Sequence, residues 1–384
     1  MSLFKKEESY LGIDIGAGGM KLVELKKTKG RAQLWTYGIL DKPLDIHPVA
    51  GASLQKDKTP EDLLHREIEP KKKKKKNESA PRIDDPRVDL FAGYLKELMK
   101  KTKASGRKVT ASLPVSHVFH AGITLPIVDE KEITHHINAK VKKMLPRPIE
   151  DMQVVHQQVY DPKNQEEGYD KKYMKFLVTA APKDLVSFYT AVFEKAGLQL
   201  EELETEAFAL ERSLVGHDMA TIMIVDMGAE RTNFFIIDGG LPVTHRSIRL
   251  GGKTFDRILM DRLQVDEQSV TQIKYDISRM KKEQIKEELF IPAIDPIIKE
   301  IKYSFDLYAH QTGNEHKKLE KIVLTGGGAL FPPVATYIQK RFNMRAFIGD
   351  PWARVVYQQG LKHLLDQNGP RMAVSIGLAM RNII

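Results

Sequence analysis

The chain has 384 residues, with 60 Lys and Arg against 51 Asp and Glu, a formal net charge of +9 and no cysteine. The absence of cysteine excludes disulfides and thiolate metal sites, and the length exceeds that of a single hydrophobic core, so we expect two lobes. Because no apolar run is long enough to cross a bilayer and the first ten residues lack a secretory signal, we expect a cytoplasmic protein.

The first predicted element is a β-hairpin from Tyr10 to Leu25, built around GIDIGAGGMK, in which Asp14 stands two residues before Gly16. A second version, IVDMGAERTNFFIID over 224–238, places Asp226 two residues before Gly228. Glycines let backbone N–H groups approach an anion closely, and oriented amides form a concavity for phosphate. Carboxylates become favourable beside phosphates only with a bound cation. Two such turns facing each other therefore predict a site for a nucleotide–metal complex.

The segment 41–86 is rich in Pro, Lys and Asp and has no aromatic residue, so we predict a loop or disordered insertion. It contains the lysine run Lys71 to Lys76, which holds much of the net charge. The run has three interpretations: a solvated loop, which we favour, attraction to anionic lipid worth about 1 kcal/mol per lysine, and nucleic-acid binding. The last ranks lowest because no aromatic residues are interleaved, and we expect no nucleic-acid partner.

Helical spacing resumes over 88–101, and a compact α+β stretch follows over 108–200. Two of its predicted strands stop at prolines. Asp129 and Glu132 form a capping-box pattern for a helix with one apolar face. A buried strand and an amphipathic helix over 185–196 complete the stretch.

The second half begins near 220 with its own strand–turn–strand, followed by a long helical zone over about 254–308. The sequence IVLTGGGALFPP, over 322–333, predicts a strand that runs into a triple-glycine turn. A helix is expected over 334–342, and the chain ends soon after SIGLAMR at 375–381.

In this order, the segments resemble the actin/Hsp70/sugar-kinase ATPase superfamily. DIGAGGMK is similar to its first phosphate motif, IVDMGAERTNFFIID to its second, and VLTGGGALFPP to its adenosine motif. ETEAFALERSL at 204–214 and SIGLAMR are similar to its two connecting helices. The resemblance implies an α/β fold: an actin-like (ribonuclease H-like) two-lobed ATPase with an inserted α+β subdomain. The implied segments are 1–107 for the first part of lobe 1, 108–200 for the inserted (1C-type) subdomain, 201–219 for a connecting helix, 220–370 for lobe 2 and 371–384 for the C-terminal connecting helix.

Within the superfamily the chain resembles the PilM family of actin-like proteins of type IV pilus assembly. The similar segments are LPIVDEKEI…KKMLPRPIEDM, VTAAPKDLVSFYTAVFEKAGL, LGGKTFDRIL and IGDPWARV. This resemblance implies a scaffold that binds the cytoplasmic N-terminus of a PilN-like membrane protein in a nucleotide-responsive way. Further implied partners are the pilus assembly platform at the inner membrane and pilus motor ATPases. We expect the partner groove along Ile133 to Leu145 and the strands over 111–125.

The resemblance also implies ATP or ADP with Mg²⁺ as the ligand. Backbone amides of the first turn would meet the phosphates, Lys21 would add charge, and Asp14 and Asp226 would hold Mg²⁺ through water. The expected nucleotide-binding residues are Asp14, Gly16, Ala17, Gly18, Gly19, Lys21, Asp226, Gly228, Arg231, Thr232, Gly252, Lys274, Lys302, Gly326, Gly327 and Gly328.

Hydrolysis is expected to be weak at most. Ala17 stands where actin-like proteins often carry Ser or Thr, so a hydroxyl contact to the terminal phosphate is missing. Glu206 matches the acidic position of the connecting helix and is the candidate for orienting a water molecule. Losing one phosphate contact can leave binding intact and slow turnover, because positioning dominates phosphoryl transfer.

Two alternatives remain at the level of sequence. An FtsA-like cell-division protein is the nearer one, although such a protein would be expected to carry a C-terminal membrane-binding helix, which is not evident before Ile384. A small-molecule kinase of the same superfamily is the other. It needs a base aspartate near a substrate site, and the sequence offers no clear candidate.

Overall fold

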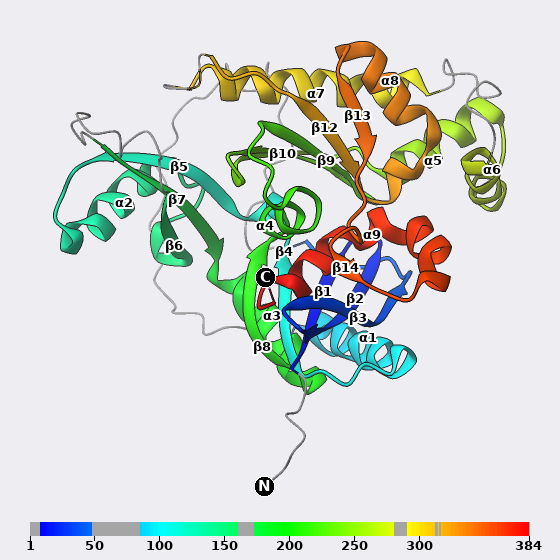
Figure 1. Cartoon of the computed structure of the whole chain (residues 1–384), viewed down its shortest axis with the longest axis horizontal. Coiled ribbons are helices and arrows are strands. Elements are labelled where there is room, and N and C mark those ends of the chain that lie inside the picture. Colours follow the sequence, from blue (N-terminus) through cyan, green and yellow to red (C-terminus); the bar gives the residue numbers. More distant parts are fainter. Residues whose placement is uncertain are drawn as a thin grey trace, which may run out of the picture.

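The computed structural model describes residues 8–47, 85–159, 173–279, 290–311, 314 and 316–383. Most of the predicted insertion, including Lys71 to Lys76, therefore lies outside the described residues. The described strands form three sheets: one in each of two lobes, and a smaller one at the side of the molecule (Figure 1). Among the described residues, no helix is both long enough and apolar enough to span a membrane.

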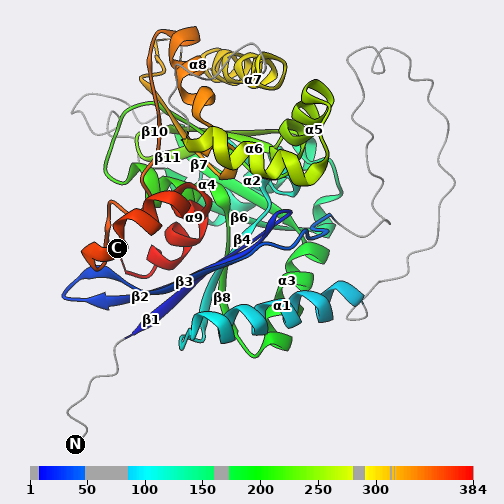
Figure 2. The same cartoon turned by 90° about the vertical axis from the view of Figure 1, so that its right-hand side faces the viewer.

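The first lobe contains a six-stranded sheet of order β14-β3-β2-β1-β4-β8. Its strands are β1 (Ser9–Gly16), β2 (Gly19–Thr28), β3 (Arg31–Leu40), β4 (Lys108–Leu113), β8 (Gln199–Thr205) and β14 (Val355–Val356). Two helices, α1 (Pro86–Thr102) and α3 (Lys183–Ala196), cover one face of this sheet, and α9 (Lys362–Met380) covers the other (Figure 2). The predicted first hairpin is confirmed, since β1 pairs antiparallel with β2.

The second lobe repeats this arrangement around a five-stranded sheet of order β11-β10-β9-β12-β13. Its elements are β9 (Ile222–Met227), β10 (Thr232–Asp238), β11 (Leu241–Ile248), β12 (Lys321–Thr325), β13 (Arg345–Ile348), α5 (Gly252–Leu263), α6 (Glu267–Arg279), α7 (Ile291–Ala309) and α8 (Pro332–Phe342). As β1 does with β2 and β4, β9 pairs antiparallel with β10 and parallel with β12. The two lobes therefore share one strand pattern, as the repeated motif predicts.

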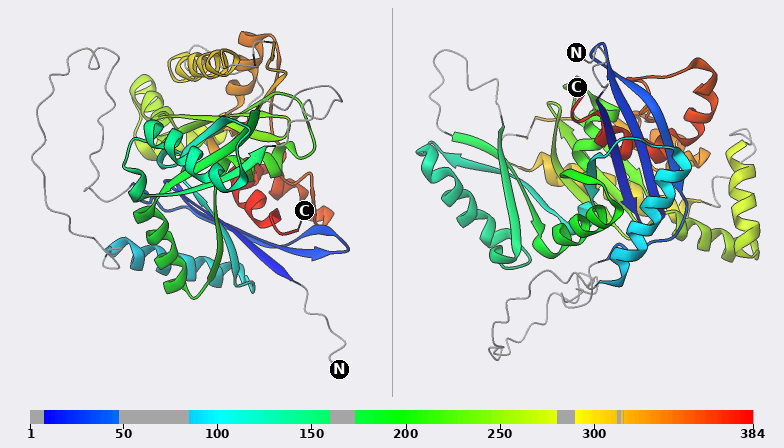
Figure 3. Two further views of the ribbon diagram at one scale, coloured as in Figure 1. Left: turned by 90° about the vertical axis from the view of Figure 1, so that its left-hand side faces the viewer. Right: turned by 90° about the horizontal axis from the view of Figure 1, so that it is seen from below.

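The inserted subdomain has a sheet of order β5-β7-β6, formed by β5 (Phe119–Pro126), β6 (Met152–Val159) and β7 (Tyr173–Pro182). Helix α2 (Glu130–Met144) packs Ile137 and Val141 against this sheet. Seen from below, the subdomain and α6 lie at opposite ends of the molecule (Figure 3). Asp129 is the N-cap residue of α2, but its side chain makes no capping hydrogen bond, so that part of the predicted capping box does not form.

The predicted boundaries of this subdomain, 108 and 200, are wider than its sheet. Val109 and Ala111 of β4 are buried with residues of α1 and α3, and β4 lies between β1 and β8. These elements therefore complete the first lobe, and the subdomain's own sheet occupies 119–182. The shorter helical turns are η2 (Val115–His117), η3 (Ile149–Asp151), η5 (Glu211–Val215, a π-helix), η8 (Gly327–Leu330) and η9 (Gln359–Leu361).

The two connecting helices cross closely between the lobes. The first is α4 (Glu206–Leu210), which continues as the π-helical turn η5. Glu204, the first residue of the predicted segment 204–214, belongs to strand β8 instead. The second, α9, begins at Lys362 rather than at the predicted boundary of 371. A Cβ at Gly377 of α9 would overlap the carbonyl oxygen of Ala209 in α4. Only glycine fits this crossing, so the two helix backbones touch directly.

We expect Gly377→Ala to lower the free energy of unfolding by about 3 kcal/mol, because the added methyl group would force the helices apart. Gly93→Ala is the matched control, since Gly93 is a helical glycine of α1 at which an added Cβ would meet no atom within 4 Å. The control should gain about 0.5 to 1 kcal/mol from helix propensity. Urea denaturation measures both, and an unchanged midpoint for Gly377→Ala would contradict the close crossing.

Candidate functional site between the two lobes

The two predicted glycine turns face each other across the junction of the lobes. In the first turn, Gly16 pairs with Gly19. In the second, the Gly228 N–H donates to the Arg231 carbonyl oxygen over 2.9 Å. A Cβ placed on Gly18 would lie 3.0 Å from the Ala229 Cβ, so the two turns approach to contact distance. The predicted facing of the turns is therefore confirmed.

Asp14 lies at the end of β1 with both carboxylate oxygens bound by partners. The Lys21 Nζ donates to Asp14 Oδ2 over 3.0 Å, and the Ser112 Oγ donates to Oδ1 over 2.8 Å. Both members of the Asp14–Lys21 pair are largely buried. The pair is a direct cross-strand partnership of the first hairpin. The ion pair with Asp14 therefore fixes the Lys21 ammonium group within the site.

The second hairpin places Asn233 opposite Asp226. The Asn233 Nδ2 donates to Glu206 Oε2 over 3.2 Å. Its Oδ1 accepts from Ser247 Oγ over 2.7 Å, and that hydroxyl accepts from Arg231 Nε over 2.8 Å. The Asn233 amide, beside Asp226, therefore joins two predicted site residues, Glu206 and Arg231, into a continuous hydrogen-bonded chain.

Asn233 and Ser112 are site residues that the sequence analysis missed. A signal for Asn233 was present, because it stands seven residues after Asp226, as Lys21 stands seven after Asp14. In two hairpins with equivalent turns, equal spacing produces equivalent cross-strand pairs. Ser112 gave no such signal, since its contact with Asp14 depends on the parallel pairing of β4 with β1.

Three carboxyl groups share this site and disfavour one another's charge. Burial and the nearby charge of Asp14 raise the pKa of Asp226 to about 6, although Lys21 and the Asn233 amide oppose the rise. Burial, followed by the charges of Asp226 and Asp14, raises the pKa of Glu206 well above its usual range. A bound cation would relieve this repulsion. A positive charge would therefore be favourable beside these three carboxyl groups.

The described residues do not offer a directly coordinating set for a metal ion. Among them, no group of three or more His, Asp or Glu side chains is arranged to hold an ion. Binding through water, as predicted for Asp14 and Asp226, is compatible with this arrangement and stays a prediction.

The triple-glycine turn packs directly on the end of β9. Gly326 has φ +81°, and a Cβ there would lie 2.5 Å from Asp226 Oδ1. A Cβ on Gly328 would lie 2.8 Å from the Met227 Cβ. The Gly326 N–H donates to the Pro370 carbonyl oxygen of α9 over 2.9 Å. The absence of side chains at these glycines lets the turn lie against the carboxylate site and α9 together.

A small pocket of about 80 Å³ opens beside this turn. Its lining residues are Gly252, Phe255, Leu259, Gly327, Gly328, Leu330 and Phe331. Its walls are largely apolar, with the aromatic rings of Phe255 and Phe331 among them. The Gly252 N–H donates to the Gly228 carbonyl oxygen over 2.9 Å, which joins the pocket wall to the second phosphate turn.

Two other predicted site residues, Thr232 and Lys302, are not among the residues that line the pocket. Thr232 is fully buried, and its hydroxyl donates to the Leu250 carbonyl oxygen, so it holds the loop before α5. Lys302 is exposed on α7. The Lys274 side chain lies outside the described residues. The roles of both lysines in binding stay predictions.

Comparisons with known proteins place this arrangement in a family. The model of the family described as type IV pilus assembly protein PilM matches residues 83–383. A solved PilM–PilN type IV pilus biogenesis complex aligns over 98% of this chain and 98% of that chain, with a TM-score of 0.75 and 20% identity. This likeness confirms the predicted fold class, an actin-like α/β fold.

Two more distant structures also align. The ethanolamine utilization protein EutJ from Carboxydothermus hydrogenoformans covers 97% of this chain and 89% of that one, with a TM-score of 0.49 and 12% identity. The alignment with MreB 5 of Spiroplasma citri bound to AMPPNP covers 96% of this chain and 94% of that chain, with a TM-score of 0.47 and 12% identity. Both TM-scores lie below 0.5 and support nothing further.

We expect Asp226→Asn to stabilise the protein without nucleotide by about 2 kcal/mol at pH 7.5, because it removes a buried like charge. The raised pKa of Asp226 means that its protonated form stabilises the fold. That stability is complete below about pH 4 and is lost as the pH rises through about 6. The difference between variant and wild type should therefore vanish at pH 4.

Thermal unfolding at pH 4 and pH 7.5 measures the effect. Asp366→Asn is the control, since Asp366 is an exposed residue of α9 paired with Lys362. Equal unfolding temperatures for Asp226→Asn and wild type at pH 7.5 would contradict the inferred carboxylate repulsion.

Proposed function

We propose, because the chain belongs to the family of the type IV pilus assembly protein PilM, that it is a nucleotide-binding scaffold of the pilus assembly platform at the inner membrane. The observation that carries nucleotide binding is the meeting of two glycine turns beside Asp14 and Asp226, next to an apolar pocket. The family match favours this function over the cell-division and kinase alternatives.

The ligand proposed for this site is ATP or ADP with Mg²⁺. Its phosphates would lie beside the two facing turns, where backbone amides within 16–19 and 229–231 would donate to them. Its base or ribose would occupy the pocket beside Gly327 and Gly328. Bound Mg²⁺ would supply positive charge, and the waters around it would be held by Asp14 and Asp226. The Lys21 ammonium group, which pairs with Asp14, would also offset part of the phosphate charge.

Hydrolysis at this site is expected to be slow. Ala17 supplies no hydroxyl to a terminal phosphate. The Glu206 carboxyl group already accepts a hydrogen bond from Asn233, and its raised pKa leaves less of it in the ionised form that could accept a proton from water, unless a nearby cation lowers that pKa. We propose binding with weak or no ATPase activity, with nucleotide acting as a conformational ligand.

The proposed partner is the cytoplasmic N-terminal peptide of a PilN-like membrane protein. The solved relative is a complex of PilM with PilN. In this chain, Met144 at the end of α2 and Ile127 just before it are 51% and 54% exposed. They flank the two ends of α2, the helix of the predicted groove region over 133–145, and would be available to apolar side chains of a peptide bound there.

The structure also offers a physical route from the nucleotide site to this subdomain. Turn η2 connects β4 of the first lobe to β5 of the subdomain. The Val115 backbone in η2 lies close enough to the Glu206 carboxyl group to lower its pKa. A change at the phosphate site would therefore act on the strand that enters the subdomain. This supports the proposal that peptide binding responds to nucleotide.

We propose a cytoplasmic location with peripheral attachment to the inner membrane through these partners. The predicted contact of Lys71 to Lys76 with anionic lipid, and contact with pilus motor ATPases, stay predictions.

Calorimetric titration with a synthetic PilN-type N-terminal peptide tests the function. We expect saturable binding and a shift in Kd of about fivefold between Mg-ATP and no nucleotide, which corresponds to about 1 kcal/mol of coupling. The absence of binding in both states, with the protein shown to be folded and able to bind nucleotide, would refute the scaffold proposal.

The variant Met144→Glu locates the peptide site. Placing a charge among apolar contacts should weaken peptide binding about tenfold or more. Met219→Glu is the matched control, because Met219 is also an exposed methionine, 65% exposed near the start of the second lobe. Equal peptide affinity for the two variants would place the peptide elsewhere.

A further inference from the structure

The start of the predicted insertion runs along the junction between the lobes. We call residues 41–47 the strap. The Leu44 N–H donates to the Ala17 carbonyl oxygen of the first phosphate turn over 3.1 Å. Asp41 pairs with Arg371 of α9, which lies against Gly327 of the triple-glycine turn. The strap therefore contacts both the first turn and the second connecting helix.

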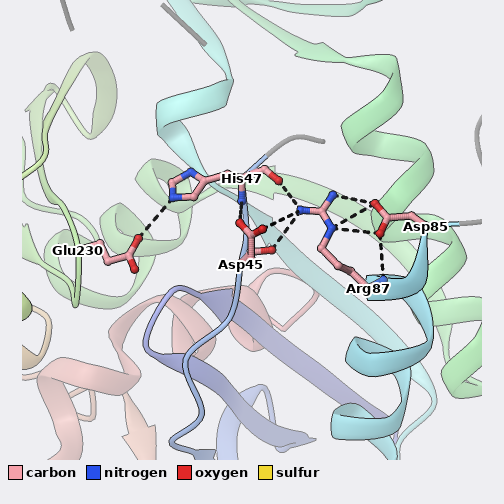
Figure 4. A network of polar contacts seen from close by, with 5 residues as sticks. All are labelled: Asp45, His47, Asp85, Arg87 and Glu230. Carbon is pink, nitrogen blue, oxygen red and sulfur yellow. Dashed lines mark hydrogen bonds and ion pairs between the residues drawn. The ribbon is translucent and has the colours of Figure 1, made fainter. Parts of the chain in front are cut away.

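The far end of the strap is fixed by α1 (Figure 4). Asp85 caps α1, accepting from the Arg87 backbone N–H over 2.9 Å, and the same carboxylate pairs with the Arg87 guanidinium over 2.7 Å. That guanidinium also donates to the carbonyl oxygens of Asp45 and His47. Arg87 holds the carbonyl oxygen of His47 on the side of α1, and the His47 imidazole points the other way, toward the second lobe (Figure 4).

There the imidazole meets the second phosphate turn. The His47 Nε2 lies 3.4 Å from Glu230 Oε2, and Glu230 also accepts from Lys253 Nζ over 2.7 Å (Figure 4). Burial would raise the pKa of Glu230, but Lys253 and His47 outweigh it, so the pKa is lowered and the group is a carboxylate. Both side chains of the pair are partly exposed, so the contact lies at the open side of the junction.

We propose that His47 contacts the γ-phosphate and makes the site discriminate ATP from ADP, an inference that rests on the proposed nucleotide binding. A terminal phosphate between the two turns would bring an anion next to the Glu230 carboxylate. The two anions then compete for the His47 N–H, and the more highly charged phosphate is the stronger acceptor. ADP lacks that group and leaves the His47–Glu230 pair in place.

The surroundings of Glu230 make this exchange of partners feasible. When His47 turns to the phosphate, Glu230 keeps its hydrogen bond with Lys253, so its charge is not left unpaired. The strap itself need not unfold, since Ala17 and Arg87 hold its backbone. Only the imidazole has to reorient, which is a side-chain movement.

Equilibrium titrations of the full chain with fluorescent ATP and ADP analogues, in Mg²⁺, test the inference. His47→Ala should weaken ATP about tenfold and change ADP less than twofold, because one charge-assisted hydrogen bond to phosphate is lost. Glu230→Gln should tighten ATP about threefold and leave ADP unchanged, because it removes both the like charge and the competitor. His363→Ala, on the exposed side of α9, is the control and should change neither.

Two further variants separate His47 from its neighbours. His47→Gln keeps an N–H donor and should retain part of the preference for ATP. The double variant His47→Ala/Glu230→Gln should show a smaller gain relative to His47→Ala than Glu230→Gln shows relative to wild type, because only the removal of the competing acceptor depends on His47. Equal gains in the two backgrounds would assign the effect to the charge of Glu230 alone and overturn the inference.

The outcomes distinguish the two proposals. Equal losses of ATP and ADP in His47→Ala, or no loss of either in a variant with the wild-type unfolding temperature, would overturn the γ-phosphate contact and leave nucleotide binding standing. Failure of the folded wild-type chain to bind either nucleotide would refute the proposed nucleotide site, and the inference with it.

Discussion

The structure depends on keeping Asp14, Asp226 and Glu206 together where the lobes meet. Burial and mutual repulsion make this arrangement costly, as the raised pKa values of Asp226 and Glu206 record. The cost is offset by neighbours with fixed geometry: Lys21 and Ser112 on one side, and the Asn233 amide on the other. A site that is unfavourable without a cation is suited to binding one, because the ligand then supplies the missing charge.

The hairpins are alike in backbone but differ in charge. In the first, a lysine stands opposite the aspartate, while in the second the equivalent position holds Asn233. The first lobe therefore neutralises its own carboxylate. The second lobe instead places Asn233 beside its carboxylate, and Asn233 hydrogen-bonds Glu206 and, through Ser247, Arg231. This asymmetry places the unbalanced negative charge on the side of α4, the helix that connects the lobes.

The sequence predicted the parts that depend on local chemistry. Glycine turns between apolar runs, and the end of α3 at Ala196, follow from residues close to each other in the chain. It did not predict that β4 and α3 complete the first lobe, because strand neighbours are decided by packing across the fold. His47 was missed for a similar reason. It lies at the start of a segment whose composition indicates disorder, and only the distant partners Ala17, Arg87 and Glu230 hold that end in place.

The proposed scaffold role requires that nucleotide and peptide each bias the same structural element. Turn η2 is placed to be that element, because its Val115 backbone lowers the pKa of Glu206 and its His117 ring lies 6.0 Å from that of His47. The strand that follows η2 is β5, an edge of the inserted sheet. Coupling through one element is reciprocal: if ATP strengthens peptide binding by some factor, the peptide must strengthen ATP binding by the same factor. A partner anchored in the membrane would then hold the protein in its ATP-bound state without any need for hydrolysis.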